Sequence, residues 1–544
     1  MNRLPRWFVA LLAIGPVVGL AVFYAWPFGN LLGEALSGEA VRDTLTRRST
    51  WEVAWFTLWQ AVVSTAVTVA VGLVPAWAIA RYAFPGRQLL VGLLTALSVL
   101  PTVVMGAAVL ALLPDRFDRT VWAIVAAHVL FNVAVVVRTV GAVWEHLPTD
   151  MEGAAATLGA SRIRVLREIT VPLLRPAITA AAAIVFLFTF TSFGVIRILG
   201  SAGTRTLEVE IWRRATRLGD FGGAAVLAVL QLSVLAIAIV WSVGLQRRSS
   251  RALDVRPNEP RRRPRPGTER RTVLGVATAT AVVAALPLAG LVVRSLSTPT
   301  GWSTSAWTDL GRTEVRPGIR LGIDPVEAIW NSVRTTLWAT TFAVTVGALA
   351  ALAITAARRA GRALDAGLLL PLGTSAVTIG FGMLITFDVP PVDWRASWWL
   401  VPVGHALVAV PFVVRTVLGV LRSVDPKLTQ AAATLGAGPV RAWRETVVPY
   451  LWKPLGVGAA LAAAISLGEF GATSFLSRSG GETVPIAIED LLGRTGSLLQ
   501  AQGYVLATLL AVTTIVIVGV VDRVQALGPA SMRPGPTPGR GGSR

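Results

Sequence analysis

The sequence predicts an all-α membrane protein of about twelve transmembrane helices, arranged as two parallel halves of six helices each. Three observations lead to this fold class. Of the 544 residues, 53% are hydrophobic and only 15% are charged, whereas soluble domains have about 25% charged residues. About twelve stretches are long and apolar enough to cross a bilayer core of ~30 Å. The second six stretches repeat features of the first six at a constant distance in the sequence.

The expected spans fall into two sets of six. Several of them are rich in Gly and Ala, as closely packed membrane helices are. No small-residue cleavage site follows the first span, so we expect it to remain as a helix. The spans are 7–28, 53–80, 88–113, 120–144, 173–198 and 222–245 in the first half, and 272–296, 328–356, 364–386, 397–421, 454–476 and 503–521 in the second.

The distribution of basic residues predicts the orientation. The formal net charge is +20, and more Arg lies in the segments on the side of the N-terminus than on the other side. The positive-inside rule therefore predicts a multi-pass protein of the plasma (cytoplasmic or inner) membrane with both termini in the cytoplasm. Segment 197–217 opposes this assignment, because it is external and has five Arg. An error in the first span or in the loop 297–325 would change the count to about eleven or thirteen.

An internal repeat organises the chain. When the sequence is shifted so that Ala154 falls on Ala431, the block Ala154–Ala160 matches Ala431–Ala437 at every position. This shift, called the repeat lag below, spans six helices, an even number. Both copies therefore have the same orientation and are related by a pseudo-two-fold axis along the membrane normal. Further matches at the repeat lag are Arg164 and Arg441, Arg167 and Arg444, Glu168 and Glu445, Pro172 and Pro449, His128 and His405, and Phe193-Gly194 and Phe470-Gly471.

The repeat divides the chain into a first half, 1–246, a linker, 247–271, a second half, 272–525, and a tail, 526–544. The linker has ten Arg and four Pro, which predicts an extended polar segment on the cytoplasmic side. Such a segment could bind nucleic acid, but a basic anchor at the membrane surface is the simpler interpretation. We therefore expect contact with the lipid bilayer and not with nucleic acid. The Gly- and Pro-rich tail is predicted to be disordered.

Two cytoplasmic loops, 145–172 and 422–450, are longer than the others and contain the repeated block. Each predicts a small-residue helix, a glycine turn and a more basic helix that a proline ends. Alanine permits close approach of another protein, glycine permits the turn, and proline disfavours continuation of the helix. The candidate residues are Gly153, Ala154, Ala155, Gly159, Ala160, Arg164, Arg167 and Pro172 in the first loop, and Gln430, Ala431, Ala432, Gly436, Ala437, Arg441, Arg444 and Pro449 in the second.

The repeated block resembles the signature loop of the membrane subunits of ATP-binding-cassette (ABC) importers, in which E-A-A is followed by three residues and G. In both copies the proline follows the glycine by thirteen positions. The resemblance implies the fold of a type I ABC importer permease. It also implies that 153–167 and 430–444 dock onto two cytoplasmic ATPase subunits. The motif's glutamate is replaced by Gly153 and Gln430, and Glu152 stands one position early.

The chain has only two lysines, Lys427 and Lys453, and Leu428 and Pro454 follow them. A nucleotide-binding P-loop needs Ser or Thr after its lysine. ATP hydrolysis is therefore expected in a separate subunit, and no catalytic residue is assigned to this chain. Because the chain has no Cys and three His, we predict neither a metal site nor a cofactor.

Three other stretches, Thr191–Gly200, Thr206–Trp212 and Ser466–Thr473, are similar to the permeases for ferric iron and for thiamine, whose two halves are fused in one chain. The resemblance implies import of ferric iron or thiamine, with a slight preference for ferric iron. It also implies a partner, an extracytoplasmic solute-binding protein. This partner is expected to dock on the external loops 197–220, 297–325 and 477–500.

Glu469 is the one carboxylate that this topology places well inside a span, and Ser192 occupies the matching position of the first half. Ionisable groups inside a membrane are costly and are functional candidates, so both residues are candidates for the translocation path. A hydrogen bond between helices, or an ion pair with an Arg, is the alternative for Glu469. For His128 and His405 we expect packing or interhelical hydrogen bonds.

Two other functions fit part of the pattern. A proton-coupled secondary transporter can also have twelve spans in two parallel halves, but the loop 81–87 lacks the G-x-x-x-D-R pattern of such facilitators, and the two long loops would have no role. A membrane scaffold or receptor could recruit cytoplasmic proteins through the same loops. Neighbouring genes for an ATPase and a secreted binding protein would favour the importer.

Overall fold

The structure is a computed structural model, and it describes residues 4–114, 117–147, 149–249, 261–298, 301–312, 314–316, 319–320, 322–390 and 392–526. Part of the linker, 250–260, and the tail from residue 527 on, for which disorder is predicted, lie outside the described residues. The described part is mainly helical, and it includes three short antiparallel hairpins in loops.

The elements alternate between long helices and short ones. The first half consists of α1 (Arg6–Leu20), α2 (Trp26–Ala35), α3 (Gly38–Thr46), α4 (Arg48–Arg81), α5 (Arg87–Val99), α6 (Thr102–Leu112), α7 (Val121–Glu145), α8 (Thr149–Thr157), α9 (Arg162–Val165), α10 (Val171–Phe190), α11 (Gly194–Leu199), α12 (Leu207–Arg213) and α13 (Phe221–Ser249). The helices of the second half are α14 (Thr268–Ser295), α15 (Ser305–Thr308), α16 (Pro325–Ala356), α17 (Arg358–Gly373), α18 (Ala376–Phe387), α19 (Leu400–Leu421), α20 (Pro426–Thr434), α21 (Pro439–Thr446), α22 (Trp452–Gly468), α23 (Thr473–Leu476), α24 (Val484–Gly493) and α25 (Ser497–Ala526). The hairpins pair β1 (Ser297–Thr298) with β2 (Gly301–Trp302), β3 (Glu314–Arg316) with β4 (Ile319–Arg320), and β5 (Asp388–Val389) with β6 (Val392–Asp393).

The long helices confirm the predicted fold class. Among the described residues, nine helices are long and apolar enough to cross a membrane, and up to twelve segments qualify if each of three bent pairs is one span. One prediction is wrong in detail, because the third expected span of each half is broken. The stretch 88–113 consists of α5 and α6 at 110°, and 364–386 contains most of α17 and α18, which meet at 99°.

The residues at these two breaks explain the bends. Pro101 has no N–H group, and Leu100 before it has φ −57° and ψ 142°, a conformation that proline favours in its predecessor. Ser375 begins α18 by accepting a hydrogen bond from the backbone N–H of Thr378 at 3.1 Å, which is the geometry of an N-cap. Hydropathy continues across both breaks, so a profile of apolar residues does not detect them.

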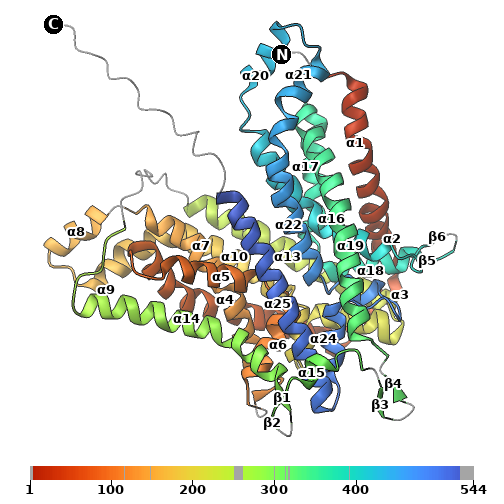
Figure 1. Ribbon diagram of the computed structural model, residues 1–544, viewed down its shortest axis with the longest axis horizontal. Helices are drawn as coiled ribbons and strands as arrows, with labels where there is room; N and C mark the ends of the chain where they lie inside the picture. Colours follow the sequence, from red (N-terminus) through yellow and green to blue (C-terminus); the bar gives the residue numbers. More distant parts are fainter. Residues whose placement is uncertain are drawn as a thin grey trace.

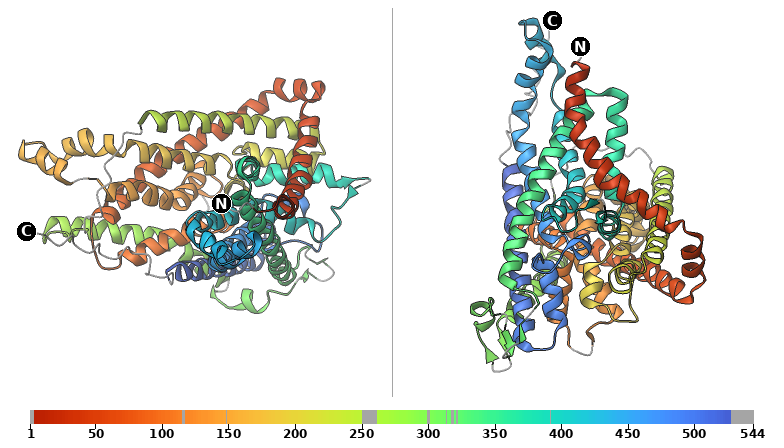
Figure 2. Two further views of the ribbon diagram at one scale, coloured as in Figure 1. Left: turned by 90° about the horizontal axis from the view of Figure 1, so that it is seen from above. Right: turned by 90° about the vertical axis from the view of Figure 1, so that its right-hand side faces the viewer.

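Two bundles of helices cross at a steep angle (Figures 1 and 2). In Figure 1 the first-half helices α4, α7 and α10 run roughly horizontally, whereas the second-half helices α16, α19 and α22 run roughly vertically. The bundles meet at one end of each. The α8–α9 segment lies at the free end of the first bundle, and the α20–α21 segment lies at the free end of the second.

The first helix of each half packs against the other half. Helix α1 lies along α16 (Figure 2), and Leu12 of α1 belongs to the same buried cluster as Ala350 and Val413 of the second half. Conversely, α14 lies against α6, where a Cβ added to Gly290 would stand 2.9 Å from Leu112 Cδ2. The halves of the sequence are therefore interlocked in space.

Close contacts at glycines repeat in both bundles. A Cβ added to Gly72 of α4 would stand 2.7 Å from Val136 Cβ of α7. In the second bundle, a Cβ added to Gly347 of α16 would stand 2.7 Å from Val413 Cγ1 of α19. Val136 and Val413 are equivalent at the repeat lag. Small residues thus bring the same pair of helices into contact in each copy.

We expect Gly72→Val to destabilise the first bundle, because the new side chain would collide with Val136 and force α4 away from α7. Overpacking of this kind costs about 1–3 kcal/mol, measurable as a lower melting temperature of the purified protein. Gly92→Val is the matched control, since a Cβ at Gly92 meets no atom within 4 Å. Equal melting temperatures for the two variants would contradict this account of the contact.

Candidate functional site

The two predicted loops have the same local structure. Each has a nine-residue helix, α8 or α20, followed by a glycine in the left-handed region, with φ +82° at Gly159 and +85° at Gly436. The backbone N–H of Ala160 donates to the carbonyl of Ala155 at 3.0 Å, and the N–H of Ala437 donates to that of Ala432 at 3.1 Å. A residue with a side chain is strained at positive φ, so the two glycines are required by this turn.

The second helices of the two loops end differently. We expected proline to end the basic helix in both loops, and for Pro172 this is wrong. A π-helical turn, Leu166–Thr170, joins α9 directly to α10, and Pro172 lies in the first turn of α10. The extra residue of a π-helical turn changes the hydrogen-bond register, so proline is accommodated. Near Pro449 the helix does break, because α22 follows at an angle of 55°.

Most candidate residues of the loops face solvent, and two pairs of alanines are half-buried. The i,i+4 ion pair is the same in both copies: Arg164 Nε lies 3.1 Å from Glu168 Oε2, and Arg441 Nε lies 2.8 Å from Glu445 Oε1. Ala155, Ala160, Ala432 and Ala437 are half-buried, whereas Gly153, Ala154, Gly159, Arg164, Arg167, Pro172, Gln430, Ala431, Gly436, Arg441, Arg444 and Pro449 are exposed.

The loops also expose a leucine that the sequence interpretation missed. Leu158 is 89% exposed and Leu435 is 88% exposed, and each directly precedes the glycine of its turn. Burying a leucine side chain is worth about 1.5–3 kcal/mol. Each of these two exposed leucines could therefore add that much free energy to the binding of another protein. The sequence does contain a sign of these leucines, because Leu158 and Leu435 match within the repeated block.

Glu152, one position before the expected glutamate, connects the first loop to the end of α4. Its Oε1 accepts hydrogen bonds from Arg81 Nη2 at 2.6 Å and from Thr170 Oγ1 at 3.0 Å. Arg81 also donates to the carbonyl of Leu147 at 3.3 Å. In the second loop, where Thr429 occupies the equivalent position, a hydroxyl contact between Thr429 and Thr446 at 2.9 Å joins α20 to α21. At these equivalent positions the first loop is therefore held by a carboxylate, and the second by a neutral hydroxyl.

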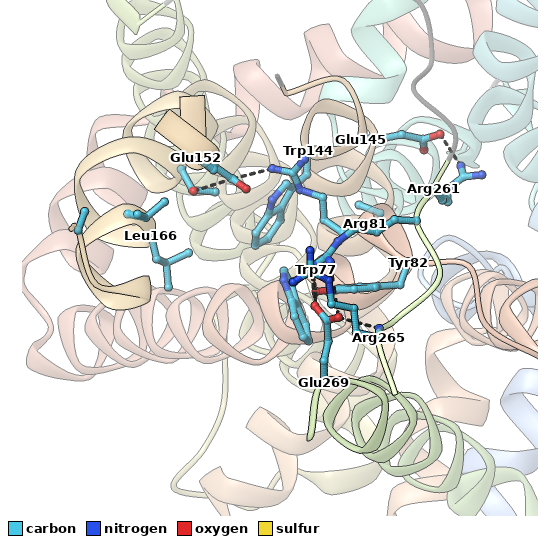
Figure 3. A pocket seen from close by; sticks show the side chains of 16 residues that line it. Trp77, Arg81, Tyr82, Trp144, Glu145, Glu152, Leu166, Arg261, Arg265 and Glu269 are labelled. Carbon is cyan, nitrogen blue, oxygen red and sulfur yellow. Dashed lines mark hydrogen bonds and ion pairs between the residues drawn. The ribbon is translucent and has the colours of Figure 1, made fainter. Parts of the chain in front are cut away.

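The end of the linker packs beside the first loop. Arg262 Nη2 donates to Tyr82 Oη at 2.8 Å and to Glu269 Oε1 at 2.5 Å, and Arg261 pairs with Glu145 at 2.5 Å. Burial and the hydrogen bond to Glu269 raise the pKa of the Tyr82 hydroxyl, which keeps it a donor. These groups and the first loop surround a cavity of about 860 Å³ (Figure 3).

Glu469 lies at the end of α22. Its side chain is buried and accepts several hydrogen bonds. It accepts from the backbone N–H groups of Ala472 at 2.9 Å and Thr473 at 3.1 Å, and from Thr473 Oγ1 at 2.9 Å. Its Oε2 lies 3.2 Å from His405 Nε2. The structure thus contains the interhelical contact that was the alternative for Glu469. A role of Glu469 or Ser192 toward the solute stays a prediction.

The two histidines bond between helices, as expected. His405 Nδ1 lies 2.9 Å from Ser466 Oγ, and its Nε2 lies 2.7 Å from Thr473 Oγ1. His128 Nδ1 lies 3.0 Å from Ser64 Oγ. Both rings are buried.

Glu469 is not the only buried carboxylate. Glu208 of α12 is fully buried and accepts a hydrogen bond from Gln231 Nε2 at 2.5 Å. Glu210 pairs with Arg213 at 2.6 Å and with Arg214 at 3.3 Å. The sequence interpretation placed these residues in the external loop 197–220, because the short helix α12 has too many charged residues to be counted as a span.

The two halves touch at residues that the repeat makes equivalent. The rings of Phe193 and Phe470 lie 5.1 Å apart, and they directly follow Ser192 and Glu469 in the sequence. A Cβ added to Gly468 of α22 would stand 3.0 Å from Pro101 of the first half. The contact between equivalent phenylalanines places the pseudo-two-fold axis of the two parallel halves between them.

Comparison with known proteins gives relatives along almost the whole chain. The thiamine transport system permease protein of Brucella suis is 28% identical over 547 residues, which covers 95% of this chain and 94% of the relative. The corresponding protein of Escherichia coli K12 is 23% identical and covers 87% of this chain and 89% of the relative. The sulfate transport system permease protein CysT of Salmonella typhimurium is 35% identical over 211 residues, 36% of this chain and 76% of the relative.

A bacterial ABC transporter involved in the import of the acidic polysaccharide alginate is a structural neighbour, with a TM-score of 0.40 and 13% identity over 45% of this chain and 96% of that one. The family model described as binding-protein-dependent transport system inner membrane component matches residues 69–251 and 343–527. One match lies before the other along the chain, and together they cover more than half of it. The chain therefore belongs to this family of ABC importer permeases and contains the family's domain in two copies.

Proposed function

We propose that this chain forms the translocation path of an ABC importer for thiamine and is driven by two separate ATPase subunits. The observation that carries the coupling is the duplicated loop. Two surfaces of the same shape, each with an exposed leucine beside a left-handed glycine, stand at the free ends of the two bundles (Figure 1). Two equivalent surfaces fit two copies of one cytoplasmic partner.

The crossing of the bundles supports alternating access. The bundles meet around Phe193 and Phe470. They diverge toward the loops 145–172 and 422–450, which we call the coupling loops (Figure 1). A change in the distance between these loops would therefore rock one bundle against the other. Partners that hold the loops together only when ATP is bound would favour one orientation, since only a state-dependent contact can shift such an equilibrium. In this proposal the divergent arrangement is the inward-facing state.

The external side offers a surface for a solute-binding protein. The loop after α14 has the β1–β2 hairpin, α15 and the β3–β4 hairpin, and Trp302 at the β1–β2 hairpin is exposed. An exposed tryptophan is typical of a protein interface. We propose docking there and on 197–220 and 477–500, with both termini of the chain in the cytoplasm.

Thiamine is favoured over ferric iron as the solute. The relatives of Brucella suis and Escherichia coli, which cover at least 87% of this chain, are named for thiamine transport, whereas the sulfate permease matches only 36% of it. The family membership also favours an importer subunit over a proton-coupled transporter or a scaffold.

The chain, co-expressed with the ATPase and binding protein of the proposed importer and reconstituted in vesicles, is expected to accumulate radiolabelled thiamine only with ATP and binding protein. Excess unlabelled thiamine should block uptake, and ferric citrate should not. Accumulation of labelled ferric iron instead, or uptake that needs no ATP, would contradict the proposal.

A further inference from the structure

Four residues where the two halves meet form an asymmetric cluster. Arg197 of α11 and Ser474 of α23 are equivalent at the repeat lag, and so are Trp212 of α12 and Glu489 of α24. Equivalent positions thus have different chemistry: the first half contributes a cation and an indole, and the second contributes a hydroxyl and a carboxylate. A dimer of identical halves could not form this arrangement, so it depends on the divergence of the two fused copies.

The guanidinium of Arg197 lies between an aromatic face and a carboxylate. Its Cζ stands 3.7 Å from the centroid of the Trp212 ring, and its Nη2 pairs with Glu489 of the other half. The Trp212 indole N–H donates to the backbone carbonyl of Ser474 at 3.4 Å. The side chains of Arg197 and Glu489 are only 14% and 24% exposed. The cluster therefore joins the two halves through one cation, one ring and one carboxylate.

The bonding of Arg197 is incomplete. Its Nε is buried and has no hydrogen-bond partner among the described residues. Buried donors whose role is purely structural normally have such a partner. A second cation, Arg217, lies 5.2 Å from the same ring, and two like charges near one ring repel each other. Both features lower the free energy needed to move Arg197 out of the cluster.

An indole face beside a carboxylate is a recognition site for an organic cation. In this structure the guanidinium of Arg197, which is part of the chain, occupies that position. The pair Arg197–Glu489 joins α11 to α24, which belong to different halves, and in the proposed mechanism these halves separate during transport. Removing Arg197 without a replacement would leave Glu489, whose side chain is only 24% exposed, without its ion-pair partner, which is costly. A cationic solute that enters as the halves separate would supply the missing charge.

We propose that Trp212 and Glu489 form a transit site for an aromatic organic cation, and that Arg197 occupies this site whenever the solute is absent. The proposal rests on thiamine as the imported solute, because its thiazolium ring has a permanent positive charge. The tethered guanidinium closes the path between transport events, and the solute displaces it. This assigns a solute-binding role to residues outside the coupling loops and other than Glu469.

The test is equilibrium binding to the purified full-length chain in lipid nanodiscs, with radiolabelled thiamine and, separately, benzyltrimethylammonium as probes. Arg197→Ala is expected to bind both cations at least tenfold more tightly than the unmodified chain, because the internal competitor is gone. Millimolar guanidinium ion should compete with the probes in this variant. Arg197→Ala combined with Glu489→Gln should lose the gain, as should Arg197→Ala combined with Trp212→Leu.

Arg48→Ala is the control. Arg48 pairs with Glu52 at 2.8 Å in an exposed ion pair, so this variant also removes one paired cation and should leave binding unchanged. If Arg197→Ala does not accumulate in the membrane, Arg197→Gln takes its place with the same expectation.

Equal affinity of the Arg197 variant and the unmodified chain for both probes, or a gain that survives Glu489→Gln, would overturn the proposal. If the assembled transporter imports thiamine but the Arg197 variant shows no gain, the site fails and the proposed function stands. If it imports no thiamine, benzyltrimethylammonium still decides the site.

Discussion

Replacing Leu158 and Leu435 together with Asp is expected to abolish binding of the ATPase subunits and with it all ATP-driven uptake. Each leucine is almost fully exposed at the tip of its loop, and burial of one leucine in a partner contributes about 1.5–3 kcal/mol. Asp would also place a charge where the proposed docking buries an apolar side chain. A loss of about 10- to 100-fold in affinity at each loop follows, measurable by co-purification and by the ATPase rate.

The same positions provide the control. Leu158→Met with Leu435→Met keeps apolar side chains of similar volume, so binding and ATPase rate should stay near those of the unmodified chain. Both double variants should insert and melt normally, because neither leucine packs on the rest of the chain. Normal ATPase stimulation in the Asp variant would show that the partner docks elsewhere.

His405→Leu is expected to destabilise the second bundle by about 1–3 kcal/mol, the range for leaving a buried polar group without its hydrogen-bond partner. The ring of His405 contacts Ser466, Thr473 and Glu469 at 2.7–3.2 Å, and leucine would leave these groups without it. A markedly lower melting temperature and lower membrane level would report the effect. His146→Leu is the control, since the ring of His146, directly after α7, bonds to the carbonyl of Ala142 in the last turn of that helix, at 2.7 Å.

A double-mutant cycle separates the contribution of Glu469. His405→Leu with Glu469→Leu removes both partners, so its destabilisation should be smaller than the sum of the single ones by about 0.5–3 kcal/mol. Additive effects would show that the two side chains do not interact. Glu469→Gln keeps an acceptor for the N–H groups of α23 and should fold normally. Impaired uptake in that variant would place Glu469 in the path, and normal uptake would assign it to structure alone.

The coupling loops could be predicted from the sequence because their structure is local. The Ala-rich block forms a helix of nine residues in each copy, and Gly159 and Gly436 both adopt the positive φ that ends it. Every group that makes this turn lies within a few positions along the chain. The effect of Pro172 was not predictable in the same way, because one π-helical turn next to it changed the hydrogen-bond register.

The membrane character, the internal repeat and the coupling loops were determined by the sequence alone, since they depend on hydropathy, identity at a fixed lag and local turns. The tertiary structure decided which side chains meet between helices. Glu469 with His405, and Arg197 with Glu489, are joined by contacts between residues far apart in the sequence. A carboxylate or a guanidinium in an apolar region must find a partner, but only the fold determines which partner is within reach.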